Sequence, residues 1–174
     1  DYGTQIAITH NALCVLTAGV IECIAGFSPN PLVDQLVANP ISDANYFTLA
    51  ERRDVGCSIN YRGELTCWGD DSLFLSGAPS LSPVQQVDMF NNHACVHDGE
   101  SIECWGDNSY GQSTPPTPVV MPGKLLDVAV GDRHTCLLDD QSNVYCWGDS
   151  SQMQLDVPYD LDDVISIEAG EAHT

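Results

Sequence analysis

Apolar residues recur along the chain in short segments that are separated by polar turn residues. Two positions are apolar in every copy of this pattern: one lies eight residues before a cysteine, and the other lies two residues before the next cysteine. The first position holds Ile6, Leu49, Val87 and Val128, and the second holds Ile21, Leu65, Ile102 and Val144. Short apolar segments between turn residues are typical of β-strands. We expect these side chains to face a core.

The cysteines show that the pattern is an internal repeat. They form four pairs, with 9 or 10 residues from one member to the other, and the first members follow one another after 43, 38 and 41 residues. The pairs are Cys14 and Cys23, Cys57 and Cys67, Cys95 and Cys104, and Cys136 and Cys146. Turn residues lie inside each pair, namely Ala18-Gly19, Arg62-Gly63, Asp98-Gly99 and residues 139–143. Each pair therefore brackets a predicted β-hairpin with a turn of two or three residues.

The geometry of such a hairpin favours a disulfide within each pair. Residues opposite one another on adjacent strands have Cβ atoms about 4.5–5.5 Å apart, which is near the separation that a disulfide needs. Zinc is the competing interpretation, but zinc motifs place two to four residues between their ligands, whereas these pairs have eight or nine. Four disulfides indicate an oxidising compartment. We expect an extracellular, periplasmic or cell-surface protein.

A repeat of about 41 residues made of short strands is typical of a blade of a β-propeller, usually with four strands. The sequence predicts an all-β fold with four complete blades and the start of a fifth. The expected repeats are 1–40, 41–82, 83–122, 123–162 and the incomplete 163–174. We treat the chain as a single partial propeller domain.

A tryptophan follows the second cysteine in three of the repeats, in the sequence Cys-Trp-Gly-Asp. These residues are Trp68, Trp105 and Trp147. A row of tryptophans can form a platform for a sugar, but one indole per repeat at a fixed position is typical of a core. The glycine allows a sharp turn after the indole. We expect the tryptophans to cover the apolar layer between blades.

Three histidines, His93, His134 and His173, share one position of the repeat. They could form a metal ring at the propeller axis, but a repeated histidine that is hydrogen-bonded to the backbone is the simpler interpretation. His10 and His97 fall outside this position. We predict neither a metal site nor a cofactor.

Charge limits the classes of partner. The 174 residues include 25 acidic and five basic side chains, for a formal net charge of −20. This charge repels the phosphates of nucleic acids and anionic membranes, and no apolar run approaches the roughly 18 residues of a membrane span. The acidic residues are interpreted as a solvated surface, with a docking face for a basic partner or calcium sites as alternatives. No EF-hand spacing supports calcium.

Catalytic motifs are missing from the sequence: it has no Gly-x-Ser-x-Gly elbow, phosphate-binding loop, His-Glu-x-x-His or dinucleotide fingerprint. Paired carboxylates of the kind used by glycosidases are not singled out by any pattern. We predict that the chain is not an enzyme. The candidate contact segments are the proline-containing connections 27–43, 73–83 and 113–123, which we expect to be irregular.

The sequence GDRHTCLL at 131–138, with VYCWGD at 144–149, resembles the repeats of the regulator of chromosome condensation family. Residues 93–95 (HAC) and 102–112 (IECWGDNSYGQ) resemble them as well. The first repeat departs from the pattern, since Ile24-Ala25-Gly26 replaces Trp-Gly-Asp, and the second has Val55 in place of the histidine. The resemblance implies a propeller of seven blades, and the paired cysteines resemble the disulfide-containing secreted branch. It carries no catalytic residue over to this chain.

These observations predict an extracellular protein-binding or adhesive module without catalytic activity, which has a protein partner or self-associates. The alternatives are a structural subunit of an extracellular assembly, an inhibitor of a secreted enzyme and a carbohydrate-active enzyme. Residues 164–174 repeat the approach to Cys136, and seven blades need roughly 290 residues. We expect the natural protein to continue beyond Thr174, or its open blade faces to be covered by another chain.

Overall fold

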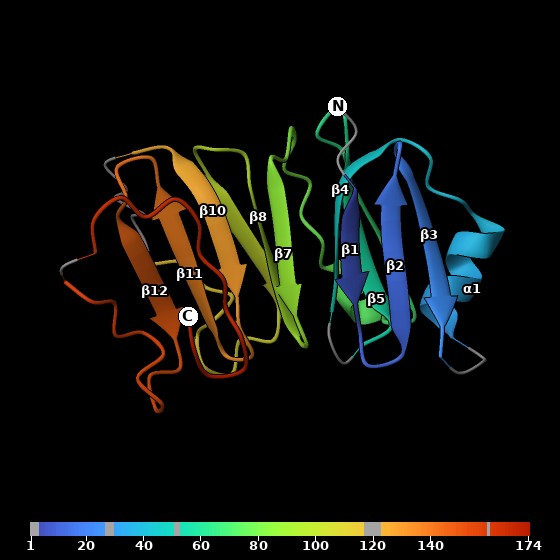
Figure 1. Cartoon of the computed structure of the whole chain (residues 1–174). Helices are drawn as coiled ribbons and strands as arrows, with labels where there is room; N and C mark the ends of the chain where they lie inside the picture. The colour runs from blue at the N-terminus through green and yellow to red at the C-terminus, as the bar shows by residue number, and fades with distance from the viewer. Residues whose placement is uncertain (1–3, 27–29, 51–52, 117–122, 160) are drawn as a thin grey trace.

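The computed structural model consists of four three-stranded antiparallel sheets arranged side by side, which confirms the all-β prediction (Figure 1). It describes residues 4–26, 30–50, 53–116, 123–159 and 161–174. We call the sheets blades 1 to 4. They comprise β1 (Gln5–Ile8), β2 (Ala12–Thr17) and β3 (Val20–Ala25); β4 (Ala44–Leu49), β5 (Val55–Asn60) and β6 (Leu65–Gly69); β7 (Gln86–Phe90), β8 (His93–His97) and β9 (Ile102–Gly106); and β10 (Leu125–Val130), β11 (His134–Asp139) and β12 (Val144–Gly148).

The first strand of each blade lies next to the first strand of the neighbouring blade, so β1, β4, β7 and β10 follow one another across the molecule. We call them the inner strands. Each of these blades has three strands in the described part of the chain, and not the four that are usual for a propeller. Beside the third strands of blades 1 and 2, the chain forms short helices, α1 (Pro31–Ala38) and α2 (Ser72–Ser76).

These helices correct the expectation that the connections 27–43 and 73–83 are irregular. In α1, the Asn30 side chain accepts a hydrogen bond from Val33 N, Pro31 occupies the first turn, and Leu32 and Leu36 are buried. Asp71 caps α2 in the same way by accepting a hydrogen bond from Phe74 N. Both N-terminal caps were readable from the sequence. In the connection 113–123, residues 117–122 lie outside the described residues.

The core is divided into three layers, each lying between two consecutive blades. We call the face of a blade that packs on the preceding blade its front face, and the opposite face its back face. The blade 3 front face, for example, contributes Val87, Val96 and Trp105 to the layer shared with blade 2. Each blade therefore depends on its neighbours to bury its apolar side chains.

Of the predicted core positions, Ile6 is wrong, whereas Leu49 lies in the core as predicted but at another position of the repeat. Ile6 is 61% exposed, because no blade formed by the described residues packs on the front face of blade 1. Leu49 is buried but is not the equivalent of Val87, because β4 pairs with β5 two residues out of step with the other blades: Thr48 faces Cys57, whereas Asp88 faces Cys95. The equivalent of Val87 is Phe47, which is fully buried.

Four disulfides join Cys14 to Cys23, Cys57 to Cys67, Cys95 to Cys104 and Cys136 to Cys146, the pairs expected from the sequence. Each bond links residues that face one another in a hairpin, with Cα atoms 4.0–4.1 Å apart. This separation is close to that of a non-hydrogen-bonded antiparallel pair. Only the first hairpin has a two-residue turn, since Thr17 faces Val20; the others have turns of four or five residues.

The hairpin turns also connect consecutive blades. The carbonyl groups of Gly19, Gly63 and Gly99 accept hydrogen bonds of 2.8–2.9 Å from the backbone N–H groups of Ala44, Val84 and Leu125, which lie at or just before the next inner strand. All three glycines have positive φ. In blade 4 the position is taken by Ser142, also at positive φ, whose Oγ donates to Val164 O. The turn glycines therefore hold the next blade in register.

Candidate functional site

The inner strands are bridged by side chains that take the place of backbone partners. Gln5 donates to Phe47 O at 2.7 Å and accepts from Phe47 N at 3.0 Å. Gln86, at the same position of blade 3, accepts from Val128 N at 3.0 Å and donates to Asp127 at 2.6 Å. Sequence reasoning missed this pair, although both glutamines directly precede the apolar position eight residues before a cysteine. Their amides fix the spacing of adjacent blades.

Carboxylates continue the same arrangement toward the end of the chain. Asp88 accepts a hydrogen bond from Val130 N, and Asp127 accepts one from Ile167 N. Burial raises the pKa of the Asp88 carboxyl to about 7, against the opposing effect of the hydrogen bond from Val130 N, and Glu168 and Asp127 add to the rise. Burial, with Asp88 nearby, also raises the pKa of Tyr46. The inner strands therefore hold a buried carboxyl group, Asp88, whose pKa is raised by burial and by neighbouring carboxylates.

The repeated histidines connect consecutive blades through threonine. Nε2 of His93 lies 2.9 Å from Oγ1 of Thr135, and Nε2 of His134 lies 2.8 Å from Oγ1 of Thr174. The threonine hydroxyl group of the next repeat is a partner that the sequence did not predict. Burial lowers the pKa of His93 to about 4, against the opposing effect of a hydrogen bond with the backbone of His134. Burial also lowers the pKa of His134. Both rings are neutral at pH 7 and act as links between blades.

The remaining histidines lie elsewhere. His97 is buried and contacts Gln86 Oε1 at 2.9 Å through Nε2, so it holds that bridging amide. His173 lies beside Gly170 at the surface, and His10 is exposed. Among the described residues, no group of three histidine, cysteine, aspartate or glutamate side chains is arranged to hold a metal ion.

The three tryptophans are buried between blades, with Trp68 in the layer of blades 1 and 2, Trp105 in the next layer and Trp147 in the third. Trp147 Nε1 donates to Gln112 O at 2.8 Å, whereas Trp68 Nε1 and Trp105 Nε1 have no hydrogen-bond partner among the described residues. The difference has a local cause. Gln112 belongs to an irregular loop after blade 3, whereas the helices α1 and α2 follow blades 1 and 2.

The glycine after each tryptophan is required by the backbone. Gly106 has φ +99°, and a Cβ atom there would collide with Asn92 O in the turn of the same blade. Gly69 and Gly148 have φ values of +127° and +113° and face equivalent carbonyl groups. The Trp-Gly-Asp sequence therefore places the indole on the front face while the chain turns tightly away behind it.

Two arginines lie in the loops between the first two strands of their blades, Arg53 in blade 2 and Arg133 in blade 4. Arg53 pairs with Asp71 and donates to Asn92 of the next blade from Nε and Nη2 at 3.0 and 2.8 Å. Arg133 stacks over the Tyr110 ring at 4.8 Å. Both guanidinium groups bind groups of the protein itself and connect blades along this rim.

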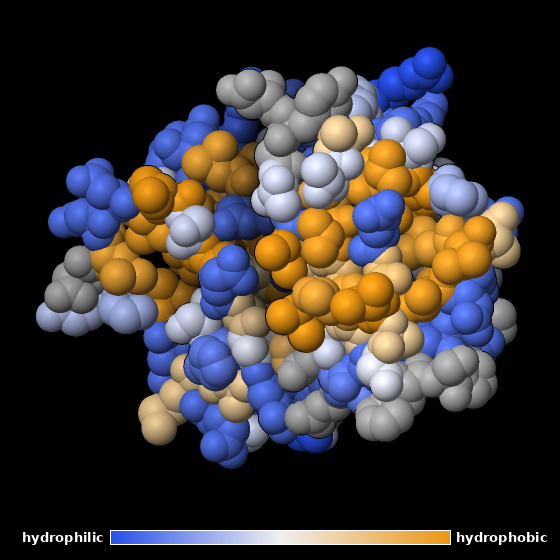
Figure 2. Space-filling model, turned by 45° about the vertical axis from the view of Figure 1, so that its right-hand side comes forward, coloured by the Kyte–Doolittle hydropathy of each residue, from blue (hydrophilic) through white to orange (hydrophobic). Residues whose placement is uncertain are grey.

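The front face of blade 1 is an exposed apolar surface (Figure 2). Ile6 and Ile8 of β1 are 61% and 68% exposed, and Ile24 of β3 is 67% exposed. Leu13 and Val15 lie between them on β2, because Ile6 faces Val15 and both Ile8 and Ile24 face Leu13. The hydrophobic side chains in Figure 2 gather on the side of the molecule that blade 1 occupies in Figure 1.

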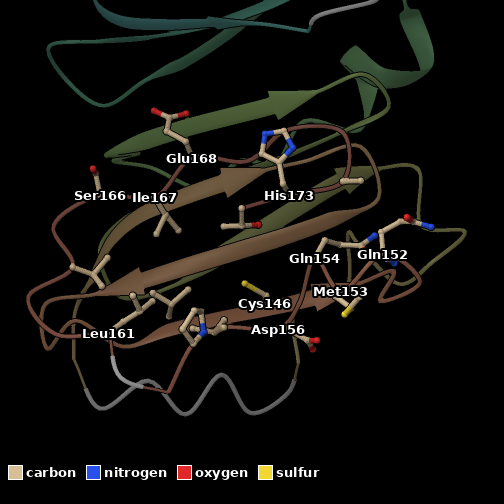
Figure 3. Close-up of a pocket in the computed structure, with 16 residues that line it drawn as sticks. Cys146, Gln152, Met153, Gln154, Asp156, Leu161, Ser166, Ile167, Glu168 and His173 are labelled. Carbon is tan, nitrogen blue, oxygen red and sulfur yellow. Dashed lines mark hydrogen bonds between the residues drawn. The ribbon is translucent and has the colours of Figure 1, made fainter.

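A groove of about 630 Å³ lies at the other end of the molecule, between the back face of blade 4 and the segment 152–174. Figure 3 shows Met153, Leu161 and Ile167 arranged around Cys146. Val144 and Val164 add to its apolar lining, whereas Asp156 and Glu168 bring negative charge to it. The molecule thus has an exposed apolar surface at each end.

The structure brings together the predicted cysteines and places the tryptophans between blades, but it does not gather the histidines into one site. The apolar front face of blade 1 and the groove behind blade 4 were not predicted as sites. Their residues have ordinary strand patterns, and only the register of the blades shows which faces are uncovered. None of the helices in the described residues has the length and apolar character of a membrane span.

Residues 126–154 match the model of the regulator of chromosome condensation (RCC1) repeat. The fold is similar to the crinkly WD40 ectodomain of the Arabidopsis thaliana receptor kinase ACR4, with a TM-score of 0.72 and 20% identity over 97% of this chain and 65% of that one. It is also similar to the ectodomain of the Physcomitrella patens receptor kinase CR4, with a TM-score of 0.72 and 21% identity over 98% of this chain and 49% of that one. A third similar structure is Prp20p of Saccharomyces cerevisiae, a protein studied for its binding to Gsp1p and histones. Its TM-score is 0.72, with 11% identity over 98% of this chain and 55% of that one.

The chain thus spans about half to two thirds of the length of these structures. At these identities the likeness concerns the fold, and the four disulfides agree with the disulfide-containing branch. The predicted resemblance to the repeats of the regulator of chromosome condensation is confirmed, and the four sheets are blades of a β-propeller.

Proposed function

We propose that this chain is an extracellular protein-binding module without a catalytic role. The observation that supports the proposal is the apolar front face of blade 1, on which Ile6, Ile8 and Ile24 are exposed side by side. Each isoleucine side chain that a partner covers contributes about 1.5–3 kcal/mol to binding before entropy losses. A contiguous apolar surface of this kind is typical of a protein–protein interface.

Two further observations support the setting and the class of partner. The four disulfides favour an oxidising compartment such as the extracellular space. The net charge of −20 disfavours nucleic acid. The rigid blades, fixed by disulfides and bridging side chains, present the face without a large loss of entropy on binding.

The proposal is tested by comparing three immobilised proteins: the wild type, Ile8→Asp on the front face, and Val37→Asp on α1 as a matched control. Val37 is also an exposed apolar residue, at 76%, but it lies on the helix outside the front face. A partner from the extracellular fraction should be retained by the wild type and by the control, and its affinity for Ile8→Asp should fall about tenfold or more, because an aspartate must be desolvated at the interface. Equal retention by all three proteins would remove the front face as the binding surface.

A second candidate function, a structural subunit of an extracellular assembly, is favoured by one observation. The chain has a second uncovered apolar surface, the groove at its other end. A module with two such surfaces can join two neighbours at once.

A further inference from the structure

We propose that Tyr159 is a site of O-sulfation, where a sulfotransferase of the secretory pathway transfers a sulfate group to the phenol oxygen. The proposal rests on the proposed function in one respect, because it needs the extracellular setting that the four disulfides favour. It does not involve the front face of blade 1. Three observations carry it: the exposure of Tyr159, its place in the repeat and the acidic residues on both sides of it.

Tyr159 lies in the connection that follows β12, where its side chain is open to a modifying enzyme. The residue is fully exposed, at 101%, and the neighbouring Val157 and Pro158 are exposed too. Tyr61 and Tyr110, by comparison, are 56% and 46% exposed. Among the described tyrosines, Tyr159 therefore offers the most accessible phenol oxygen.

This exposure does not depend on where the sequence ends. Tyr159 lies five residues before the hairpin contact at Val164, and the same position before blades 2 and 3 holds Asn39 and Pro79. Asn39 is exposed and Pro79 is half-buried, although a complete blade follows each of them. Tyr159 is also not among the described residues that line the groove behind blade 4. A further blade in that groove would therefore leave its side chain accessible.

The residues around Tyr159 are acidic. Four aspartates lie within four residues of it, namely Asp156, Asp160, Asp162 and Asp163. Asp160 lies outside the described residues, and the other three are exposed. No lysine or arginine occurs in residues 134–174. An accessible phenol therefore stands in a segment whose charged side chains are all negative.

The other described tyrosines lack this setting. One acidic residue lies within four positions of each of Tyr46, Tyr61, Tyr110 and Tyr145. Tyr61 directly precedes Arg62, and the ring of Tyr110 lies under the guanidinium group of Arg133. A positive charge beside a tyrosine opposes its approach to a basic active site. These residues therefore serve as internal controls.

The chemistry of the transfer explains why an acidic segment is recognised. A sulfotransferase binds an anionic donor, a nucleotide in which an anhydride bond joins phosphate to sulfate, so its active site is basic and attracts negative charge. An oxygen–sulfur bond forms at the Tyr159 phenol while the sulfur–oxygen bond of the anhydride breaks. The phenol proton passes to a base of the transferring enzyme, and the nucleotide leaves with its phosphate. Nothing is oxidised or reduced.

Phosphorylation is the competing modification, because a phosphate group also suits an accessible tyrosine and adds almost the same mass, about 80 Da. The compartment favours sulfate. Four disulfides indicate that the chain folds outside the reducing cytosol, where most protein kinases act. The two modifications are separated by the enzymes that remove them.

The first test uses the purified chain, a tyrosylprotein sulfotransferase and its nucleotide phosphosulfate donor. Mass spectrometry of the intact protein should show one addition of about 80 Da, and fragmentation of its peptides should place the addition on Tyr159. Tyr159→Phe should abolish the addition. Tyr61→Phe, which removes another exposed tyrosine, should retain it.

Charge variants test the recognition. Asp162→Asn combined with Asp163→Asn should lower kcat/KM for sulfation about tenfold or more, because the segment loses two of its charges. Glu100→Gln combined with Glu103→Gln removes the same charge at exposed positions of blade 3 and is the matched control. This control should keep kcat/KM within about twofold of the wild type, since distant charges are screened.

A second test uses the chain as secreted by a eukaryotic host. The secreted protein should carry the same addition on Tyr159, the addition should resist a phosphatase, and it should disappear when chlorate blocks synthesis of the phosphosulfate donor. Removal by the phosphatase would identify a phosphate group and overturn the proposal.

Three further results would overturn it: no addition in either test, an addition that persists in Tyr159→Phe, or equal kcat/KM for the Asp162–Asp163 variant and its control. Partner binding is measured separately, so an unmodified Tyr159 together with weaker binding by Ile8→Asp excludes only the sulfation. Sulfation of a chain whose partner binds every variant equally excludes only the front face. Free thiols in place of the four disulfides would contradict the setting on which both proposals rest.

Discussion

Nε2 of His93 in blade 3 lies 2.9 Å from Oγ1 of Thr135 in blade 4. The threonine hydroxyl donates its proton to Gln112 O at 3.0 Å, so it accepts the proton that His93 carries on Nε2. One neutral histidine, one hydroxyl group and one carbonyl group therefore form a buried chain of hydrogen bonds across the interface. Removing the hydroxyl in Thr135→Val should lower the free energy of unfolding by about 1–2 kcal/mol, measured by urea denaturation.

The same link makes stability depend on pH. The pKa of His93 is about 4 in the folded protein and near 6.5 in the unfolded chain, so the unfolded state takes up a proton first. The contribution of the neutral ring is complete above pH 6.5 and is lost as pH falls to 4, by up to about 3 kcal/mol. His93→Gln, which does not titrate, should remove this loss. An unchanged acid profile of unfolding in that variant would show that His93 is not the cause.

Asp88 has the opposite pH dependence. Its pKa is raised to about 7, so the stability that comes from the protonated carboxyl is complete below pH 3.8 and is lost as pH rises to 7. Asp88→Asn can still accept from Val130 N but carries no charge. It should raise the free energy of unfolding at pH 7 by on the order of 1–3 kcal/mol, with little gain at pH 4. A gain of equal size at both values would point to packing and not to charge.

Trp147 and Trp105 form a matched pair for testing one hydrogen bond. Both indoles are buried between blades, but only Trp147 Nε1 has a partner, Gln112 O. Trp147→Phe should therefore cost about 1 kcal/mol more than Trp105→Phe in thermal or urea unfolding, because the second substitution removes an N–H group that was already unpaired. Equal costs would mean that the Gln112 bond adds no net stability.

Gly106 and Gly111 allow two effects of replacing a glycine to be measured separately: backbone strain at positive φ, and collision of the new Cβ atom with a neighbour. Both have positive φ, but a Cβ atom at Gly106 would collide with Asn92 O, whereas one at Gly111 would meet nothing within 4 Å. Gly111→Ala should cost about 1 kcal/mol through backbone strain, and Gly106→Ala should cost at least about 2 kcal/mol because the turn must also move. The measurement is the midpoint of urea unfolding in both variants, and similar midpoints would contradict the collision.

Peptide mapping of the unreduced protein should yield four local cross-links and no free thiol. Replacing Cys95 and Cys104 together by alanine should lower the free energy of unfolding by about 2–3 kcal/mol, as expected for a loop of this size. Any cross-link between repeats would contradict the blade register.

The sequence-based prediction succeeded where a residue type repeats at a constant distance. The cysteine spacing and Trp105, with its equivalents, led to the blades and to the disulfide-linked hairpins, although three of the four turns are longer than predicted. It went wrong where one repeat changes length: the turn before β5 is two residues longer than the others, so counting back from Cys57 reached Leu49 and not Phe47. Exposure of Ile6 could not be read at all, because its pattern matches that of Val87 and only the absence of a covering blade distinguishes them.

Contacts between repeats were the least predictable part of the site. The contact of His93 with Thr135 was not predicted, because a periodic histidine does not reveal that the residue next to its counterpart in the following repeat will lie beside its ring. The bridges made by Gln5 and Gln86 were missed for a similar reason: each glutamine lies 42 residues before its partner, but the sequence does not show which side chains face the next strand until the register is known. Helices α1 and α2, in contrast, had readable caps in Asn30 and Asp71.

The carbonyl groups of Gly19, Gly63 and Gly99 reach forward to the next repeat and not back to the previous one. Each hairpin tip therefore loses its backbone partner when the repeat after it opens, whereas the repeat before it can open without breaking that bond. Hydrogen exchange at Ala44, Val84 and Leu125 thus reports whether two neighbours are docked and not whether one blade is folded. The molecule is a directional row of repeats. When one repeat unfolds, the first bond lost outside it is the hydrogen bond to the hairpin turn of the repeat that precedes it.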